Sequence, residues 1–315
     1  MSKTSRMVIA GLFAVLGFVA NVHAATEGGA RDKVLKGDQV CTRCHDGTES
    51  YPVFDIGKTK HGTVADGRTG SCTACHGASE THIRIPEDAT ERPQPTVSFG
   101  AKSKTPVAER NAQCLNCHSG AKRMLWQGST HEQEDLACTS CHQVHAQHDK
   151  VRDKQTQPEK CFTCHKDKRN EINKASRHPI KEGKVACSDC HNPHGSAGPK
   201  LMARDTVIDT CYSCHAEKRG PFLWNHQPVT EDCAICHNPH GSSNARLLKQ
   251  SMPFLCQECH EPGSHQGIAP SSRTNASLAL PQPDIASARQ CVNCHTNLHG
   301  GNSPLNSSVN RSLVR

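Results

Sequence analysis

The sequence predicts an elongated fold of short α-helices and loops with negligible β-sheet, packed around covalently bound cofactors instead of a side-chain core. Three observations predict this fold. The chain is only 34% hydrophobic and 3% aromatic over 315 residues, whereas ordinary globular domains are about 45–50% apolar. All 20 cysteines fall in ten Cys-x-x-Cys-His motifs. The motifs recur in pairs, and the segments between them show little of the periodicity of a long helix or strand.

Cys-x-x-Cys-His is the attachment signature of c-type haem, in which both cysteines form thioethers to the porphyrin and the histidine ligates the iron. Zinc sites or a disulfide framework are the alternatives. Zinc does not require a histidine directly after the second cysteine, and with 22 histidines in 315 residues chance supplies one about once in fourteen. Its presence in every motif predicts a multihaem cytochrome c with ten covalently attached haem c groups.

The motifs define two sets of candidate residues. The predicted thioether cysteines are Cys41, Cys44, Cys72, Cys75, Cys114, Cys117, Cys138, Cys141, Cys161, Cys164, Cys187, Cys190, Cys211, Cys214, Cys233, Cys236, Cys256, Cys259, Cys291 and Cys294. The predicted proximal iron ligands are His45, His76, His118, His142, His165, His191, His215, His237, His260 and His295.

Residues 1–24 have the pattern of a secretory signal peptide, with Lys3 and Arg6 before an apolar run over Met7–Ala20 and small residues at a cleavage site ending at Ala24. The run is shorter than the roughly 20 apolar residues of a membrane-spanning helix, although a retained anchor is the alternative. We therefore expect an exported, soluble mature protein that begins near Ala25.

The net charge of the polypeptide does not indicate a nucleic-acid partner. Removing Lys3 and Arg6 from the formal +7 leaves +5 on the mature chain. Each haem carries two propionates, and an oxidised iron–porphyrin core offsets one of them, so ten haems add roughly −10. The holoprotein should be acidic overall.

The ten motifs group into five modules of two motifs, which begin at Cys41, Cys114, Cys161, Cys211 and Cys256. Modules three and four are the most alike, and the first and last differ most from the repeat. Such repetition is typical of arrays in which each unit packs mainly on its neighbours.

Eleven histidines of the mature chain lie outside the motifs, one more than ten haems need as second axial ligands. His145 follows its motif histidine by three residues, as in modules three and four, so we expect His148 to be the spare. Met124, Met202 and Met252 are expected to pack and not to ligate. The predicted distal ligands are His61, His82, His131, His145, His178, His194, His226, His240, His265 and His299.

Chain length limits which iron a distal histidine can reach. Three residues span at most about 10 Å, so His194 and His240 cannot reach the far face of their own haem and must serve a neighbour. His131, His178 and His226 follow a motif histidine by 11 to 13 residues, which is enough chain to pass around a porphyrin. Ligation between neighbours would hold successive haems close together.

Saturated axial positions favour electron transfer over catalysis, because an enzyme needs an open iron position for its substrate. A multihaem oxidoreductase with an open haem is one alternative, and a store of haem or electrons without a defined route is another. Neither is favoured by ten complete motifs in a regular array.

Four stretches carry a family resemblance: residues Cys211–Gly241, CSDCHNPHGS (Cys187–Ser196), CTSCHQVH (Cys138–His145) and CVNCHTNLHG (Cys291–Gly300). The chain resembles the MtrA/DmsE-type periplasmic decahaem cytochromes over essentially its whole mature length. The resemblance implies an elongated wire of two halves with five haems each, and we expect an N-terminal half over residues 25–180 and a C-terminal half over 181–315. It further implies a periplasmic protein sheathed by an outer-membrane β-barrel porin. Its implied partners are periplasmic or inner-membrane cytochromes and, in some members, an outer-surface multihaem cytochrome.

Members of this family differ in the direction of electron flow. Some carry electrons outward to ferric minerals or dimethyl sulfoxide, and others, of the MtoA type, carry them inward from ferrous iron. We favour the iron-oxidising type, with extracellular Fe(II) as the donor. The spacing in the first module and the segment Gly267–Gln290 depart from the repeat.

Overall fold

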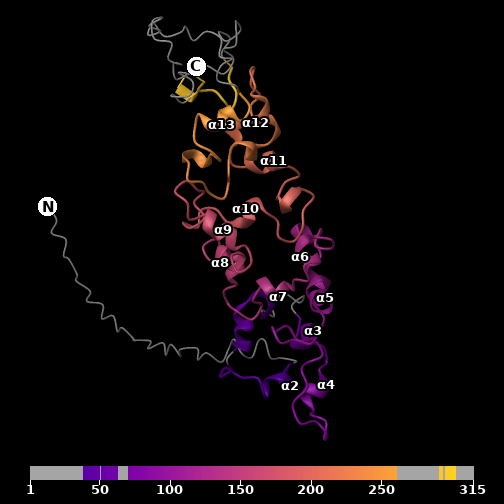
Figure 1. The fold of residues 1–315 in the computed structure, drawn as a ribbon. Coiled ribbons are helices and arrows are strands. Elements are labelled where there is room, and N and C mark those ends of the chain that lie inside the picture. The colour runs from indigo at the N-terminus through magenta and orange to yellow at the C-terminus, as the bar shows by residue number, and fades with distance from the viewer. Residues whose placement is uncertain (1–37, 50, 63–69, 261–290, 294, 303–315) are drawn as a thin grey trace, which may run out of the picture.

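The computed structural model describes residues 38–49, 51–62, 70–260, 291–293 and 295–302, so the expected signal peptide lies outside the described ranges. The described chain is elongated, with α2 (Gln39–Thr42) near one end and α13 (Phe254–Gln257) near the other (Figure 1). The predicted fold class is confirmed: loops and short helices predominate, and the longest described helix is α5 (Val107–His118), with 12 residues.

The described helices are short because most of them consist of one motif or one turn beside it. The remaining α-helices are α3 (Cys72–His76), α4 (Glu80–Ile83), α6 (Thr130–Gln133), α7 (Cys138–Cys141), α8 (Gln157–Cys161), α9 (Lys166–Glu171), α10 (Cys187–Cys190), α11 (Val207–Tyr212) and α12 (Gln227–Glu231). The 3₁₀ helices are η1 (Val53–Lys58), η2 (Lys60–Gly62), η3 (Ala121–Arg123), η4 (Lys150–Arg152), η5 (Pro199–Leu201), η6 (Ala216–Lys218), η7 (Cys233–Ile235), η8 (Ala245–Leu247) and η10 (Cys291–Asn293).

Each motif closes a helical turn on itself. In eight motifs the backbone N–H of the histidine donates to the carbonyl oxygen of the first cysteine at 2.9–3.1 Å, and the other two motifs lie in α3 and α5. This is the i→i+4 bond of one α-helical turn. The turn therefore brings both thiols and the imidazole of a motif close together.

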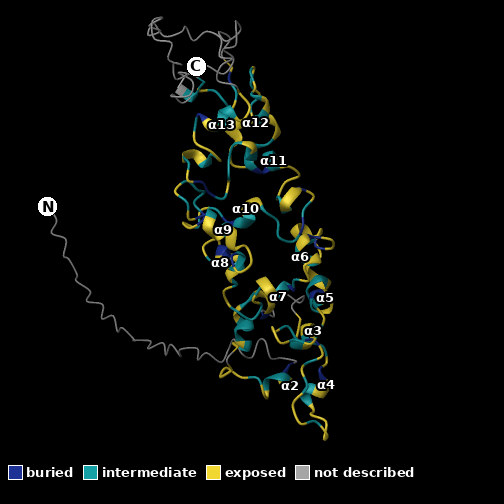
Figure 2. Ribbon diagram, in the orientation of Figure 1, coloured by how far each residue is buried: buried dark blue, intermediate teal, exposed yellow. Residues whose placement is uncertain are grey.

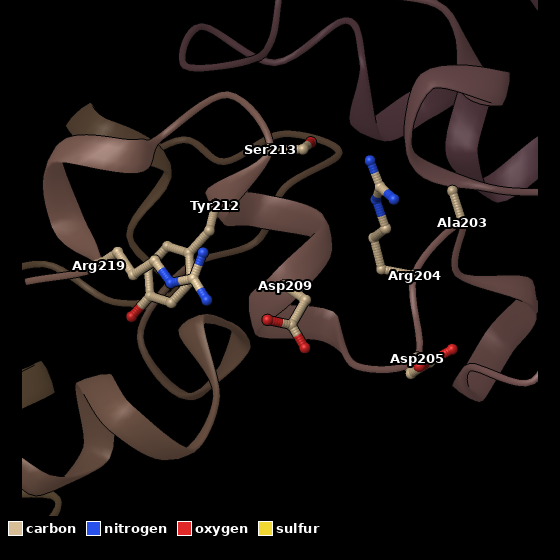
Figure 3. A pocket seen from close by; sticks show the side chains of 7 residues that line it. All are labelled: Ala203, Arg204, Asp205, Asp209, Tyr212, Ser213 and Arg219. Atoms are coloured by element: carbon tan, nitrogen blue, oxygen red, sulfur yellow. The ribbon is translucent and has the colours of Figure 1, made fainter.

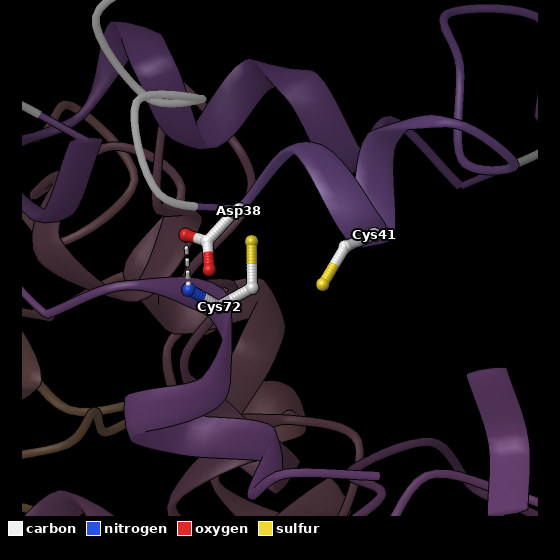
Figure 4. Close-up of side chains that lie close together, drawn as sticks. All are labelled: Asp38, Cys41 and Cys72. Carbon is white, nitrogen blue, oxygen red and sulfur yellow. Dashed lines mark hydrogen bonds between the residues drawn. The ribbon is translucent and has the colours of Figure 1, made fainter. Parts of the chain in front are cut away.

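Buried polar side chains join the two motifs of a module in the first three modules. Asp38 accepts the backbone N–H of Cys72 through Oδ2 at 2.7 Å, as Figure 4 shows. Asn111 accepts the N–H of Cys138 at 2.8 Å, and Gln157 accepts the N–H of Ser188 at 3.0 Å. All three side chains are buried. Each satisfies a free N–H at the start of the second motif helix.

The side-chain core of the described residues is small. Phe162, Ile172 and Ile180 form one buried cluster, with Val185 packed against it, and the other buried residues are scattered along the array (Figure 2). β structure in these ranges amounts to four isolated bridges. Within the same ranges, no helix is both long and apolar enough to span a membrane. The low apolar content is thus matched by a fold without a continuous core.

We expect the polypeptide to remain unfolded when haem attachment is blocked, because its side chains bury too little apolar surface to offset the entropy of ordering. Limited proteolysis of apoprotein and holoprotein tests this, with cleavage expected to be more than about tenfold faster in the apoprotein. Far-ultraviolet circular dichroism should show no cooperative thermal transition in the apoprotein. A sharp transition there would contradict this account of the fold.

Candidate haem-binding sites

Nine of the ten motif histidines face a second histidine across a gap. The ring centroids are 5.9–6.3 Å apart in these nine pairs. With metal–imidazole bonds of about 2.0–2.1 Å, two imidazoles on opposite sides of one iron have ring centres roughly 6 Å apart. The residues therefore fit a haem iron between each pair. The tenth motif histidine is His295, and the remaining candidate ligand, His265, lies outside the described residues.

Eight of the nine pairs follow a rule that the repeat makes visible. A histidine between the two motifs of a module faces the first motif histidine of the next module, and a histidine after the second motif faces the second motif histidine of the preceding module. The forward pairs are His61–His118, His131–His165, His178–His215 and His226–His260. The backward pairs are His145–His76, His194–His142, His240–His191 and His299–His237.

Each interface between neighbouring modules is thus crossed by two pairs that run in opposite directions. The ninth pair, His45–His82, lies within module one, which has no preceding module to exchange with. His194 and His240 face a neighbouring module, as their short separation from the motif requires. His131 has enough chain to circle the haem of its own module, yet the structure turns it toward the next one.

Backbone bridges align the exchanged histidines at two interfaces. Ser176 and Ser242 exchange N–H···O bonds of 3.0 and 2.7 Å, two residues before His178 and two after His240. Trp224 and Gly301 exchange bonds of 3.0 Å at the same positions relative to their own ligand candidates. This antiparallel bridge fixes the register between the exchanged segments of the two modules.

Ring hydrogen bonds tie the two exchanged segments together as well. The Nδ1–H of His131 donates to the carbonyl oxygen of Pro193 at 2.8 Å, and that of His178 donates to Pro239 at 2.7 Å. Each proline directly precedes the histidine that crosses the same interface in the other direction. The bond therefore fixes the orientation of one ring relative to the backbone that carries the other.

Glycine directly after the backward-facing histidine permits this close approach. Gly195 and Gly241 have φ angles of +108° and +154°, where side chains are disfavoured. A Cβ at Gly195 would lie 1.9 Å from the carbonyl oxygen of Leu125, and one at Gly241 would lie 2.0 Å from that of Glu171. The repeated His-Gly sequence is thus a requirement of the interface between modules.

The thiols of consecutive motifs lie next to each other along the whole series. Within each module the first cysteines of the two motifs are neighbours that shift each other's pKa: Cys41–Cys72, Cys114–Cys138, Cys161–Cys187, Cys211–Cys233 and Cys256–Cys291. Between modules the second cysteines interact electrostatically: Cys75–Cys117, Cys141–Cys164, Cys190–Cys214 and Cys236–Cys259. The attachment points therefore follow one another in space in the order of the sequence.

The environment of the first thiol pair is shown in Figure 4, where Asp38 lies beside Cys41 and Cys72. The carboxylate oxygens and both sulfur atoms come close enough to resemble a small metal site. Both cysteines belong to haem motifs, so we assign the cluster to haem attachment. Burial, reinforced by the carboxylate, raises the pKa of Cys72 to about 12.

Burial also keeps two of the facing imidazoles neutral. It lowers the pKa of His145 to about 4 and that of His194 to about 4, with neighbouring histidines adding to the effect. Because these pKa values are depressed, both rings are unprotonated at neutral pH and offer the lone pair that metal ligation requires. Their Nδ1 atoms are buried without a hydrogen-bond partner.

His148 and Met124 are both largely exposed. His148 faces none of the motif histidines; its side chain is 75% exposed and its Nε2 lies 3.2 Å from Asp153. The expectation that Met124 packs is wrong, because 72% of this residue is exposed. It lies at the C-terminal end of η3.

A cavity of about 440 Å³ opens between the sixth and seventh motifs, lined by the guanidinium groups of Arg204 and Arg219 and by Asp209 and Tyr212 (Figure 3). It adjoins both motifs, because Ala203 on its wall donates its N–H to Cys190 at 2.8 Å and Tyr212 lies within the seventh motif. Arginine is the side chain best suited to bind carboxylates such as haem propionates.

These features together define a multihaem c-type cytochrome. The doubled CXXCH motif family matches residues 178–220 and 226–265, and a family of NrfB-like cytochrome c-type proteins matches residues 72–158. The multiheme cytochrome MtrA of Shewanella baltica is 42% identical over 273 residues, which cover 85% of this chain and 80% of that protein. The chain belongs to the MtrA family of multihaem cytochromes, and its haems are covalently bound electron-transfer centres.

A more distant relative matches a smaller part of the chain. The cytochrome c-type protein NrfB of Haemophilus influenzae is 27% identical over 194 residues, which cover 52% of this chain and 84% of that protein. Its similarity reflects the shared repeat of paired motifs.

We expect His145→Ala to open one axial position, because His145 faces His76 across a ring-to-ring distance of 6.1 Å. The variant should gain a carbon monoxide-binding haem and a high-spin ferric signal in electron paramagnetic resonance. His148→Ala is the matched control, three residues away and exposed, and should leave both spectra unchanged. The converse result would contradict the assignment of the two histidines.

Proposed function

We propose that this chain is a decahaem wire that carries electrons through an outer-membrane porin between periplasmic or inner-membrane cytochromes and extracellular iron. The observation that carries the proposal is the series of facing histidine pairs, two of which cross each interface between successive modules. Haems attached along such a series follow one another from one end of the elongated fold to the other. Electron hopping requires this kind of uninterrupted succession.

The ligand set of the proposal combines the two histidine classes. Each motif histidine is the proximal ligand, and the histidine that faces it is the distal ligand. By elimination, His265 is left for His295 in module five. This would mirror module one, where His82 serves His45, so both terminal modules would satisfy their outermost haem internally. The chain would then hold ten bis-histidine haems and one spare histidine, His148.

Each haem, when bound, supplies an iron that exchanges one electron between its ferric and ferrous states. The chain contributes neutral imidazoles on both axial sides, which exclude substrate from the metal and favour negative potentials. The motif turns and the bridges between modules fix the rings before and after electron transfer. This saturated coordination disfavours the alternative of an oxidoreductase with an open haem.

The porin partner is supported by the character of the surface. Haem propionates and the charged side chains of this chain cannot enter about 30 Å of hydrocarbon, whereas a wide barrel with a polar lumen can hold them. We place the protein in the periplasm, docked into the outer membrane, with the N-terminal half (25–180) toward the periplasm and the C-terminal half (181–315) toward the outside. An outer-surface multihaem cytochrome could dock at the outer end.

Inward electron flow from extracellular Fe(II) is the direction we favour, on the resemblance to iron-oxidising members of the family. Outward flow to Fe(III) minerals or dimethyl sulfoxide is the second candidate. Both use the same ligand set and the same order of haems, so the two directions differ in the partners at the ends.

A vesicle experiment tests the wire. Liposomes that hold a reducible dye are reconstituted with this protein and its cognate porin, and Fe(II) is added outside. We expect dye reduction only with both proteins present, and a loss of more than about tenfold in rate when a terminal haem is removed. Cys41→Ala and Cys294→Ala each block attachment at one end.

His148→Ala serves as the control in the same vesicles and should retain the wild-type rate. Unimpeded transfer without the porin, or with either terminal haem missing, would show that electrons do not travel from end to end. If Fe(II) gives no dye reduction, a stronger reductant is added in its place. Dye reduction with the stronger reductant would show that Fe(II) is not the donor, whereas its absence would show that the protein does not carry electrons across the membrane.

A further inference from the structure

One motif histidine donates to a partly buried carboxylate. The Nδ1–H of His142 donates to Oδ2 of Asp149 at 2.7 Å, and the Asp149 side chain is only 17% exposed. The other carboxylate oxygen, Oδ1, accepts the backbone N–H of Gln143 at 3.3 Å. In the described part of the chain, no lysine or arginine forms an ion pair with Asp149. The carboxylate is therefore held in place with its charge directed at the imidazole.

In modules one, three and four, the ring N–H of the second motif histidine has a different acceptor. The second motif histidine of modules one, three and four donates to a backbone carbonyl oxygen. These bonds are His76 to Val97 at 2.9 Å, His191 to Lys200 at 3.0 Å and His237 to Arg246 at 2.8 Å. Module two thus replaces a neutral acceptor with a charged one.

Other carboxylates near ligand candidates are placed less effectively. His45 and Glu49 are 2.7 Å apart, but both side chains are more than a third exposed, so solvent screens the pair. Glu171 lies 3.2 Å from His240 and shares its charge with Lys168 at 3.1 Å. Among these contacts, the one between His142 and Asp149 has the least exposed carboxylate, and that carboxylate is in no ion pair with a lysine or arginine of the described residues.

A hydrogen bond from an axial imidazole to a carboxylate makes the ligand more basic, because the proton moves toward the oxygen and the ring gains imidazolate character. A more basic ligand and a nearby negative charge both stabilise ferric over ferrous iron, so the potential of that haem falls. The opposite ring, His194, has no acceptor at its Nδ1 and does not add to the effect.

We propose that Asp149 is a positioning residue that tunes the haem attached at Cys138 and Cys141, making it the most strongly reducing of the haems held by the second motifs of modules one to four. The inference rests on the proposed ligation of that haem by His142 and His194. Electron passage across this haem makes and breaks no bond: the iron gains an electron from one neighbouring haem and passes it to the next.

Asp149→Asn tests the proposal, because asparagine keeps the shape and an acceptor oxygen but removes the charge. In an optical redox titration of the full holoprotein, we expect one one-electron component to become about tenfold easier to reduce, a positive shift of about 59 mV. Asp149→Glu, which retains a carboxylate, should keep most of the wild-type behaviour. Asp153→Asn is the matched control, since Asp153 contacts the non-ligand His148 at 3.2 Å, and it should shift nothing.

The proposal is overturned when Asp149→Asn moves no component, or when Asp153→Asn produces the same shift. Should Asp149→Asn lose haem, Asp149→Ser takes its place in the same titration, with the same positive shift expected. Electron paramagnetic resonance distinguishes failure of the tuning from failure of the proposed ligation. If Asp149→Asn stays low-spin and shifts no potential, only the tuning by Asp149 is refuted. If His194→Ala produces a high-spin signal at a haem other than the one attached at Cys138 and Cys141, the ligation by His142 and His194 is refuted.

Discussion

The separation of about 6 Å between facing imidazole rings is the constraint on which the rest of this structure depends. An iron between two imidazoles tolerates little variation in this distance, because both metal–nitrogen bonds are fixed near 2 Å. The two rings of most pairs come from different modules, so the spacing must be set by contacts across an interface. The backbone bridge of Ser176 with Ser242 and the glycine at 241 are consequences of that demand.

This arrangement differs from that of ordinary repeat proteins, in which neighbouring units adhere through apolar surface. Here the described side chains offer one small apolar cluster around Phe162, and two histidine pairs cross each interface in opposite directions. A module therefore completes the sites of both neighbours and depends on them for its own. Folding, haem attachment and the order of the haems therefore depend on one another, because no internal module contains a complete pair of facing histidines.

The sequence could predict the fold class and the repeat of paired motifs but not the pairing of the histidines. Motif spacing predicted an elongated, loop-rich chain, which the structure confirms. The short offset of His194 from its motif predicted a neighbouring partner, whereas the longer offset of His131 permitted several. Its choice of His165 depends on a bond to Pro193, 62 residues away, which no local pattern reveals. The packing expected for Met124 was wrong because an apolar residue on a one-turn segment can face outward.

The hydrogen-bond acceptors of the motif histidine rings are also of two kinds, those that the repeat reproduces and those that are particular to one module. Backbone carbonyls serve as acceptors for His191 and His237, and the repeat reproduces them wherever it reproduces the turn. Such acceptors are neutral and give similar surroundings to successive sites. A side-chain acceptor can vary from module to module without altering the path of the chain, as Asp149 does beside His142. The backbone of the repeat thus fixes where electrons can go, and single side chains placed on it set how readily each site accepts them.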